Sequence, residues 1–366
     1  MKNKIESIQI LRGLAALSVV MFHYRFYLVP NGADFTIPNK LFGWGSIGVD
    51  LFFVISGFIM VFVTNENKSG VGSTLKFLEN RLTRILPTYY IILLFAFFTG
   101  GAMSTFHYPD KVSNLISALT FHPYLSDTAP LYTPKSGMFN VRWTLNYEIY
   151  FYIAFAVCLL FKHRVISLAA WFLAPIITAY LLTSSFTLST SGYQFHSVLA
   201  RFLTNPIILE FGVGVLAGYS YLFLHKKVHF KSCCLSFLAI IAVSIGITFK
   251  YLHGYSLISA VAFFFLVLIF AIQNNQILNF APKFLITLGN VSFSWYLIHV
   301  PLASFISGKV EKIYPNSMHT TTGFILLLVV SIPIAILCHK YLEIKLTQKI
   351  RGLIQRAKIK KSNAEA

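Results

Sequence analysis

Residues 9–28 read QILRGLAALSVVMFHYRFYL and form most of an apolar run from Ile8 to Leu28. A helix of ~20 residues crosses the ~30 Å hydrocarbon core of a bilayer. Arg12 and His23 interrupt this run, and ionisable side chains in a membrane span usually face a bundle interior or a wet cavity. They are separated by about three helical turns, so they share one face and lie roughly 16 Å apart along the axis. We therefore expect a polar stripe on this helix, with the other helices packed around it.

The composition predicts an all-α, polytopic membrane protein. Of 366 residues, 56% are hydrophobic and 11% charged, and the mean hydropathy is +0.68, which lies outside the range of ordinary soluble domains. We expect no cleaved signal peptide, because the first apolar run is too long, is interrupted by Arg12 and His23, and lacks a small-residue cleavage site. The net charge of +18 does not indicate nucleic-acid binding, because the basic residues collect between and after apolar runs.

Ten apolar runs predict a bundle of about ten transmembrane helices. Most lysines and arginines lie on one side if both termini are cytoplasmic, as the positive-inside rule requires. The predicted spans are residues 8–28, 45–63, 85–103, 146–161, 165–183, 203–224, 234–250, 256–272, 284–307 and 320–340.

The segments outside these spans suggest a simple domain organisation. Residues 1–345 are expected to form one membrane-embedded domain, and residues 346–366 a basic cytoplasmic tail. The tail, with TQKIRGLIQRAKIKK, should lie on anionic membrane lipids as an amphipathic helix, with its last residues disordered. The long extracytoplasmic stretch from about Ser104 to Asn146 is typical of a lid or binding loop, and the alternative is a mobile connector.

Cysteine and glycine residues are expected to be structural. Cys158, Cys233, Cys234 and Cys338 offer neither a disulfide framework nor zinc-ligand spacing, so no metal is expected. Three glycines in EFGVGVLAG have the helical spacing that allows close helix packing, and they are Gly212, Gly214 and Gly218.

Four ionisable residues fall at one predicted depth, in the outer half of the membrane. They are His23, Asp50, Glu148 and His299. A histidine beside a carboxylate is the arrangement of a general base, because the acid fixes the tautomer and stabilises the imidazolium. His23 with Asp50 or Glu148 could therefore remove a proton from a hydroxyl group. The alternative is a set of hydrogen-bonded pairs that only hold helices together.

Three arginines are expected near the cytoplasmic ends of the first and third spans. Arg81 and Arg84, in ENRLTRILP, share a helix face at i and i+3, and Arg12 lies deeper. Arginine binds phosphate through a planar, bidentate fork. The cluster therefore suits the phosphates of a cytoplasmic ligand, and the alternative is anchoring to lipid headgroups.

Five motifs in this order resemble the integral-membrane acyltransferase 3 family over nearly the whole chain. They are RGLAALSVVMFH with Arg12 and His23, GVDLFFVISGFIM with Asp50, RLTRILPTYY with Arg81 and Arg84, WTLNYEIYFY with Trp143 and Glu148, and SFSWYLIHVPL with His299. The family's ten-helix bundle and its use of acyl-CoA follow from the resemblance. Some members carry an extracytoplasmic SGNH-type hydrolase domain, which we do not expect here, so any second acceptor-handling step would require another protein.

The resemblance implies a bacterial inner-membrane O-acyltransferase, most simply an O-acetyltransferase acting on a surface polysaccharide or lipid-linked sugar. Acetyl-CoA or another acyl-CoA would be the donor, with Arg12, Arg81 and Arg84 near its phosphates. His23, Asp50 and Glu148 are the candidate catalytic residues. Trp143 and His299 are candidate acceptor-binding residues.

Two other functions fit an intramembrane set of Arg, His, Asp and Glu. A transporter or flippase for a lipid-linked glycan or acyl donor could use it as a proton relay. In a membrane scaffold, the same residues would only pack helices. An acyltransferase should consume acyl-CoA in detergent, whereas a transporter would need sealed vesicles, and scaffold substitutions should lower abundance rather than turnover.

Overall fold

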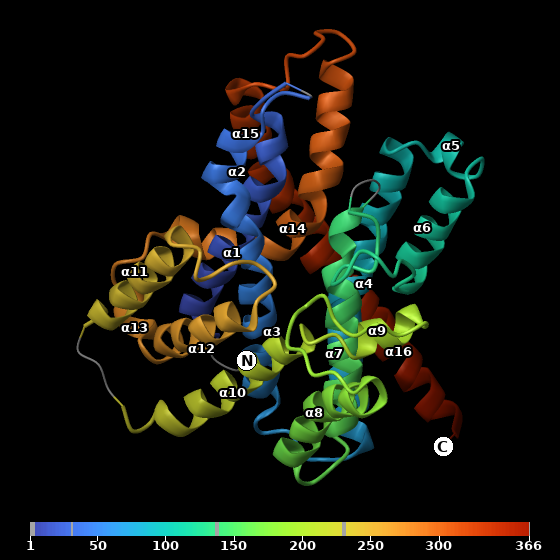
Figure 1. The fold of residues 1–366 in the computed structure, drawn as a ribbon. Helices are drawn as coiled ribbons and strands as arrows, with labels where there is room; N and C mark the ends of the chain where they lie inside the picture. The colour runs from blue at the N-terminus through green and yellow to red at the C-terminus, as the bar shows by residue number, and fades with distance from the viewer. Residues whose placement is uncertain (1–3, 31, 136–138, 229–231, 366) are drawn as a thin grey trace.

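A computed structural model describes residues 4–30, 32–135, 139–228 and 232–365; Figure 1 shows their course. The helices in chain order are α1 (Glu6–Tyr24), η1 (Arg25–Tyr27), α2 (Thr36–Phe42), η2 (Gly43–Ile47), α3 (Gly48–Thr64), α4 (Val71–Thr99), α5 (Ala102–Thr105), α6 (Pro109–Thr120), η3 (Asn140–Arg142), α7 (Trp143–Cys158), α8 (Arg164–Thr183), α9 (Val198–Leu203), α10 (Ile208–Leu224), α11 (Cys234–Thr248), α12 (Leu257–Ile272), α13 (Asn274–Leu278), α14 (Lys283–Val310), α15 (Thr321–Cys338), the π-helix η4 (His339–Leu346) and α16 (Thr347–Glu365).

The centre of the bundle is α1, which packs along α14 and also contacts α3. Glycine allows the close approach of α1 and α14. A Cβ atom on Gly289 would lie 1.8 Å from the carbonyl oxygen of Gln9, and one on Gly13 would lie 2.8 Å from the Gly289 nitrogen. Any side chain at either position would therefore force the two helices apart.

A second close pair joins α3 to α10. A Cβ atom on Gly214 would lie 2.0 Å from the carbonyl oxygen of Val54, and one on Gly218 would lie 2.7 Å from Cβ of Val61. The close packing predicted for these two glycines is confirmed. The third, Gly212, instead faces the ring of Phe172 on α8.

The third long helix, α4, begins at Val71, well before the predicted start of its span at residue 85. Its first turns carry Lys76 and Glu79, which hydropathy assigns to a loop, although a helix can continue beyond the membrane. Arg81 and Arg84 consequently lie inside a continuous helix, where they have fixed directions.

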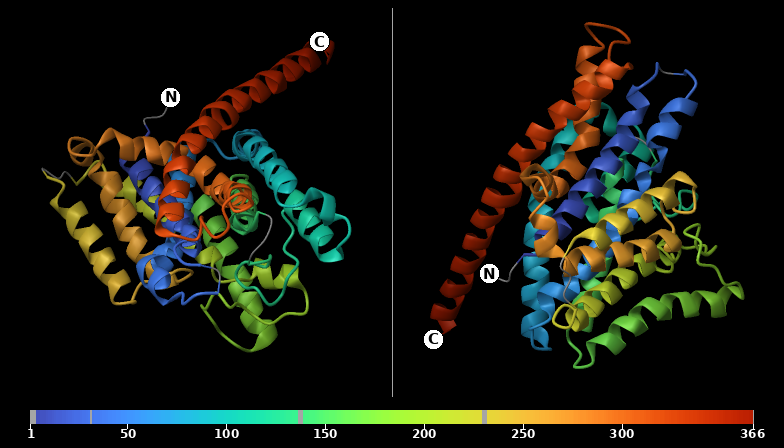
Figure 2. Two further views of the ribbon diagram at one scale, coloured as in Figure 1. Left: turned by 90° about the horizontal axis from the view of Figure 1, so that it is seen from above. Right: turned by 90° about the vertical axis from the view of Figure 1, so that its left-hand side faces the viewer.

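The C-terminal helices α15, η4 and α16 follow one another as a long rod that projects past the bundle (Figure 2). The last helix of the rod, α16, contacts the first half of α4. There, Arg351 Nε donates to Thr83 Oγ1 at 3.1 Å, and Lys358 pairs with Glu79. The tail is thus helical through Glu365. Its position on a lipid surface stays a prediction.

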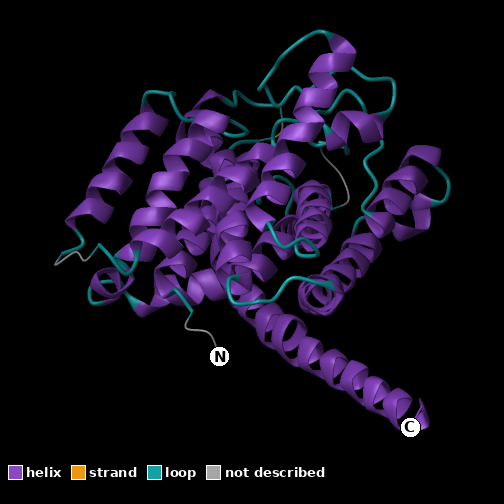
Figure 3. Cartoon of the chain, turned by 90° about the horizontal axis from the view of Figure 1, so that it is seen from below, coloured by secondary structure: helices purple, strands orange, loops and turns teal. Residues whose placement is uncertain are grey.

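Within the described ranges all regular structure is helical, as Figure 3 shows, so the predicted all-α class is confirmed. Among the residues that the structure describes, seven helical segments are long and apolar enough to cross a membrane, and they contain α1, α3, α4, α8, α10, α14 and α15. The other three predicted spans correspond to α7, α11 and α12, of 15 or 16 residues each. The total of about ten spans and the cytoplasmic termini stay predictions.

Candidate active site

Three cavities follow one another through the centre of the bundle. We call them the basic, central and outer cavities, with volumes of about 680, 80 and 850 Å³. The basic and central cavities share Arg12, Arg81 and Arg84 in their walls, and the central and outer cavities share Val49 and Tyr296. The helix α1 contributes to both ends of this series, through Arg12 at one end and His23 at the other.

The basic cavity is strongly electropositive. Among its described lining residues, five are lysine or arginine, namely Lys4, Arg12, Arg81, Arg84 and Arg351, and the acid is Glu343. Lys4 precedes α1. Burial, followed by the charges of Arg12 and Arg84, lowers its pKa from the ordinary value. This wall is suited to a ligand with several negative charges.

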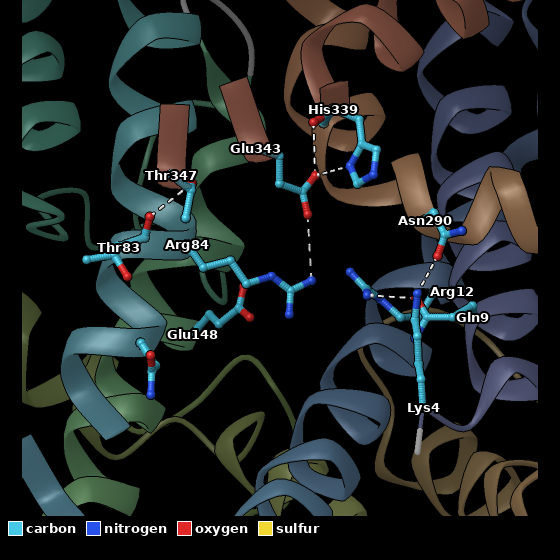
Figure 4. A network of polar contacts seen from close by, with 12 residues as sticks. Lys4, Gln9, Arg12, Thr83, Arg84, Glu148, Asn290, His339, Glu343 and Thr347 are labelled. Atoms are coloured by element: carbon cyan, nitrogen blue, oxygen red, sulfur yellow. Dashed lines mark hydrogen bonds and ion pairs between the residues drawn. The ribbon is translucent and has the colours of Figure 1, made fainter. Parts of the chain in front are cut away.

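Glu343 lies between Arg84 and His339 in the wall of the basic cavity (Figure 4). Its Oε1 lies 3.7 Å from Arg84 Nη2, while its Oε2 lies 2.8 Å from Nδ1 of His339 and accepts from Ser294 Oγ at 3.1 Å. The π-helix turns both His339 and Glu343 toward the cavity. Because π-helical turns are rare and often lie at functional sites, this local geometry is consistent with a binding role.

Arg12 faces the same space from the opposite wall (Figure 4). Its Nη1 donates to Gln9 Oε1 at 3.1 Å. No ion pair joins it to a carboxylate within the described part of the chain. Its charge is therefore available for an anion that enters between Arg12 and Arg84.

The central cavity is small, and its mostly apolar wall carries a few charged and polar side chains. Glu148 lies in its wall with Arg12, Arg81 and Arg84, and accepts a hydrogen bond from the hydroxyl of Tyr152. Glu148 thus belongs with the arginines and not with His23. The reason is the direction of α7, which packs against α4, the helix that carries Arg81 and Arg84.

Tyr296 lines both the central and the outer cavity. Its hydroxyl donates to the carbonyl oxygen of Val141 at 3.0 Å and lies 2.9 Å from Thr144 Oγ1. These contacts hold the ring between α14 and the start of α7. The space between the central and outer cavities consequently depends on the fixed position of the Tyr296 ring.

At the outer cavity, His23 meets His299. Nδ1 of His299 lies 3.2 Å from the carbonyl oxygen of Trp295, which can only accept, so this nitrogen carries the proton. Nε2 of His299 is then an acceptor, 3.2 Å from Nδ1 of His23. Nδ1 of His23 also lies 2.9 Å from the carbonyl oxygen of Val19, so it is the protonated nitrogen. Nε2 of His23 is therefore left with a free lone pair, as a base or nucleophile requires.

The carboxylate of Asp50 is directed elsewhere. It is fully buried and accepts from the backbone N–H groups of Tyr255 and Ser256, at 2.9 and 2.8 Å. A second fully buried acid, Glu210 on α10, lies beside it. Within the described residues, neither Asp50 nor Glu148 is hydrogen-bonded to His23, so the expected pairing of this histidine with a carboxylate is not found.

Trp143 lies where a ligand in the outer cavity would meet it. The residue begins α7, and its ring centroid is 5.4 Å from that of Tyr255 and 6.2 Å from that of Tyr147. Trp143, Tyr255 and His23 all line the outer cavity. His299, the other predicted acceptor-binding residue, is fully buried behind His23 and would act through it.

Seven of the eight predicted residues therefore divide into two groups, and Asp50 belongs to neither. Arg12, Arg81, Arg84 and Glu148 surround the central cavity, while His23, His299 and Trp143 lie at the outer one. Sequence reasoning missed Glu343, Glu210, Tyr255 and Tyr296. The two acids have a readable signal, an ionisable residue within or beside an apolar run. Tyr296 lies in the motif SFSWYLIHVPL, three residues before His299, whereas Tyr255 has no such signal among the 19 tyrosines of the chain.

Comparison with known proteins identifies the relatives of this chain. A family model described as an acyltransferase domain matches residues 5–340. The exopolysaccharide production protein ExoZ of Rhizobium meliloti is 31% identical over 199 residues, 52% of this chain and 54% of ExoZ. BcsY of Komagataeibacter xylinus, a membrane-bound transacylase by name, is 26% identical over 82% of this chain and 73% of its own length.

A third relative is the peptidoglycan O-acetyltransferase OatA of Listeria monocytogenes. It is 27% identical over 116 residues, which are 31% of this chain and 16% of OatA. The chain thus aligns with about half of ExoZ and a small part of OatA. No solved structure matches the chain.

Proposed function

We propose a reaction for this chain from its family: it belongs to the acyltransferase family whose model matches residues 5–340. In the proposed reaction, it transfers an acyl group from acyl-CoA to a hydroxyl of a polysaccharide or lipid-linked sugar. The names of ExoZ, as an exopolysaccharide production protein, and OatA, as a peptidoglycan O-acetyltransferase, support a surface glycan as the acceptor. The observation that carries the proposal is the series of three cavities, with arginines at one end and His23 at the other.

Acyl-CoA enters the basic cavity from the cytoplasm. Arg12, Arg84 and Arg81 bind its phosphates, since guanidinium groups form paired hydrogen bonds with phosphate oxygens. The slender pantetheine arm then extends through the central cavity toward Tyr296. The name of OatA, a peptidoglycan O-acetyltransferase, supports acetyl as the acyl group.

The acceptor sugar occupies the outer cavity, and His23 acts as general base. Its Nε2 removes the hydroxyl proton while the hydroxyl oxygen attacks the thioester carbonyl carbon. The tetrahedral intermediate then expels the coenzyme A thiolate, which takes the proton back from the imidazolium. The products are a sugar ester and free coenzyme A. In a two-step variant, Nε2 attacks the thioester itself and passes the acyl group on through an acyl-imidazole.

A reconstituted reaction tests this proposal. Full-length protein in detergent is given radiolabelled acetyl-CoA and the glycan extracted from cells that lack the protein. We expect label to enter the glycan without any membrane gradient, and His23→Ala to abolish transfer at normal protein levels.

His225→Ala is the matched control. Its Nδ1 makes the same kind of backbone contact, with Tyr221 four residues earlier, but it lines none of the three cavities. Undiminished transfer by His23→Ala, or transport of a substrate without thioester consumption, would overturn the proposal.

A further inference from the structure

The backbone of Tyr255 has an unusual conformation. Its φ of +62° is in the left-handed region, which a bulky residue rarely adopts. Such conformations persist only where the surroundings hold them, and they concentrate at functional sites. The residue lies in the short connection between α11 and α12, and this connection reaches the wall of the outer cavity.

Three contacts from other segments hold the backbone of Tyr255 and Ser256 in place. Both oxygens of Asp50 accept backbone N–H groups, one from Tyr255 and one from Ser256. Thr190 Oγ1 donates to the carbonyl oxygen of Tyr255 at 3.0 Å. Ser256 is also the residue that precedes α12, so the carboxylate of Asp50 lies at the N-terminus of that helix, where negative charge is favourable. Asp50 thus fixes the backbone on both sides of the Tyr255–Ser256 peptide bond.

The fixed backbone determines where the ring of Tyr255 lies. The ring is 5.4 Å from that of Trp143, at an interplanar angle of 77°. The two rings therefore form a corner in the wall of the outer cavity, which also contains His23. Hydroxyl-bearing residues, Ser46, Ser304 and Ser307, lie in the same wall.

We propose that Trp143 and Tyr255 form a binding corner for one pyranose ring of the acceptor, and that Asp50 is the positioning residue for this corner. The inference rests on the proposed function and names the acceptor contact within it. The apolar C–H face of a pyranose packs on an aromatic face, while its hydroxyls need polar partners. An acyl chain would pack on the rings but could not form hydrogen bonds with the serine hydroxyls.

The test measures acceptor binding separately from chemistry. Full-length protein with His23→Ala is placed in nanodiscs, and its Kd is measured for oligosaccharides released from the glycan of cells lacking the protein. We expect Tyr255→Ala to weaken binding by about tenfold or more and Tyr255→Phe to weaken it by less than about threefold. Tyr251→Ala is the matched control, because Tyr251 lies on the same connection and is 73% exposed.

Asp50 is tested through Tyr255. We expect Asp50→Ala to weaken binding, and Asp50→Asn to weaken it less, because an amide oxygen can still accept one of the two N–H groups. The double variant Asp50→Ala with Tyr255→Ala should bind no more weakly than Tyr255→Ala alone, since a positioning residue has no effect once its target is gone. A general structural role for Asp50 would instead give additive losses.

The outcomes separate this inference from the proposed function. Parent-like binding by Tyr255→Ala, additive losses in the double variant, or no binding of the oligosaccharides by the parent would overturn the inference. If Asp50→Ala does not fold, the Tyr255 variants still decide. The proposed function is tested separately by acyl-CoA consumption in Tyr251→Ala protein with an intact His23, because this variant leaves Trp143, Tyr255 and Asp50 unchanged.

Discussion

Nε2 of His299 lies 3.2 Å from Nδ1 of His23, although 276 residues separate the two in the chain. The contact takes the place that a carboxylate holds in many catalytic histidine pairs. A neutral imidazole can accept the Nδ1 proton and fix the tautomer, but it cannot stabilise an imidazolium by charge.

This pairing predicts that His299 affects turnover more than binding. His299→Leu removes one of the two acceptors beside Nδ1 of His23 and leaves the carbonyl oxygen of Val19. We expect kcat to fall by about tenfold or more while the KM for acyl-CoA changes little. His299→Gln should recover part of this loss, because its amide oxygen can accept the same proton. Steady-state transfer with the extracted glycan measures both effects. Wild-type kcat in His299→Leu would contradict the prediction.

The contact between α1 and α14 predicts a large effect of one methyl group. Gly289→Ala would place a Cβ atom 1.8 Å from the Gln9 carbonyl oxygen, so the helices that carry His23 and His299 must separate. We expect a destabilisation of about 1–3 kcal/mol and a loss of activity. Gly308→Ala, on the same helix with open space around it, is the control and should melt at or above the wild-type temperature. Equal melting temperatures for the two variants would show that the close approach is not required.

Arg84 is predicted to act on the donor. With Arg84→Ala, one charge-assisted contact to phosphate is lost, and we expect the KM for acyl-CoA to rise by about tenfold or more with a smaller change in kcat. Raising the ionic strength should increase the wild-type KM in the same direction. Arg356→Ala, an exposed arginine on α16, is the control. An unchanged donor KM in Arg84→Ala would place the phosphates elsewhere.

Glu343 is predicted to compete with the donor. Its carboxylate lies 3.7 Å from Arg84, so an incoming phosphate must displace or share this partner. Glu343→Gln removes the negative charge, and we expect the KM for acyl-CoA to fall by about threefold to tenfold. Glu79→Gln, which removes an acid paired with Lys358 on the same side of the molecule, should have no such effect. A higher donor KM in Glu343→Gln would instead indicate that Glu343 holds the cavity open.

The sequence alone predicted the elements of this fold better than their ends. Apolar runs identified the helices, because the membrane demands long stretches without charge. They did not reveal the early start of α4 at Val71, since its first turns are polar. Arg12 and His23 were recognisable as candidate site residues because a charged or titratable side chain in an apolar helix is energetically unfavourable and therefore rare.

The grouping of the site residues could not be read from the sequence. Depth along each helix suggested that His23, Asp50, Glu148 and His299 share one level, but depth does not fix which way a helix faces. In the structure, α7 directs Glu148 to the arginines, and Asp50 is directed to the connection before α12. Only His23 and His299 meet. The missing information was the rotation of each helix about its axis, which depends on contacts between distant segments.

The distance in sequence between His23 and His299 also has a consequence for the order of assembly. During synthesis, α1 leaves the ribosome long before α14, the helix that carries the partner of His23. A chain that stops before Lys283 would contain α1, with Arg12 and His23, but would lack His299, the residue that contacts the imidazole of His23. If His23 acts as we propose, acyl transfer at full rate begins only after α14 has joined the bundle and placed His299 beside it.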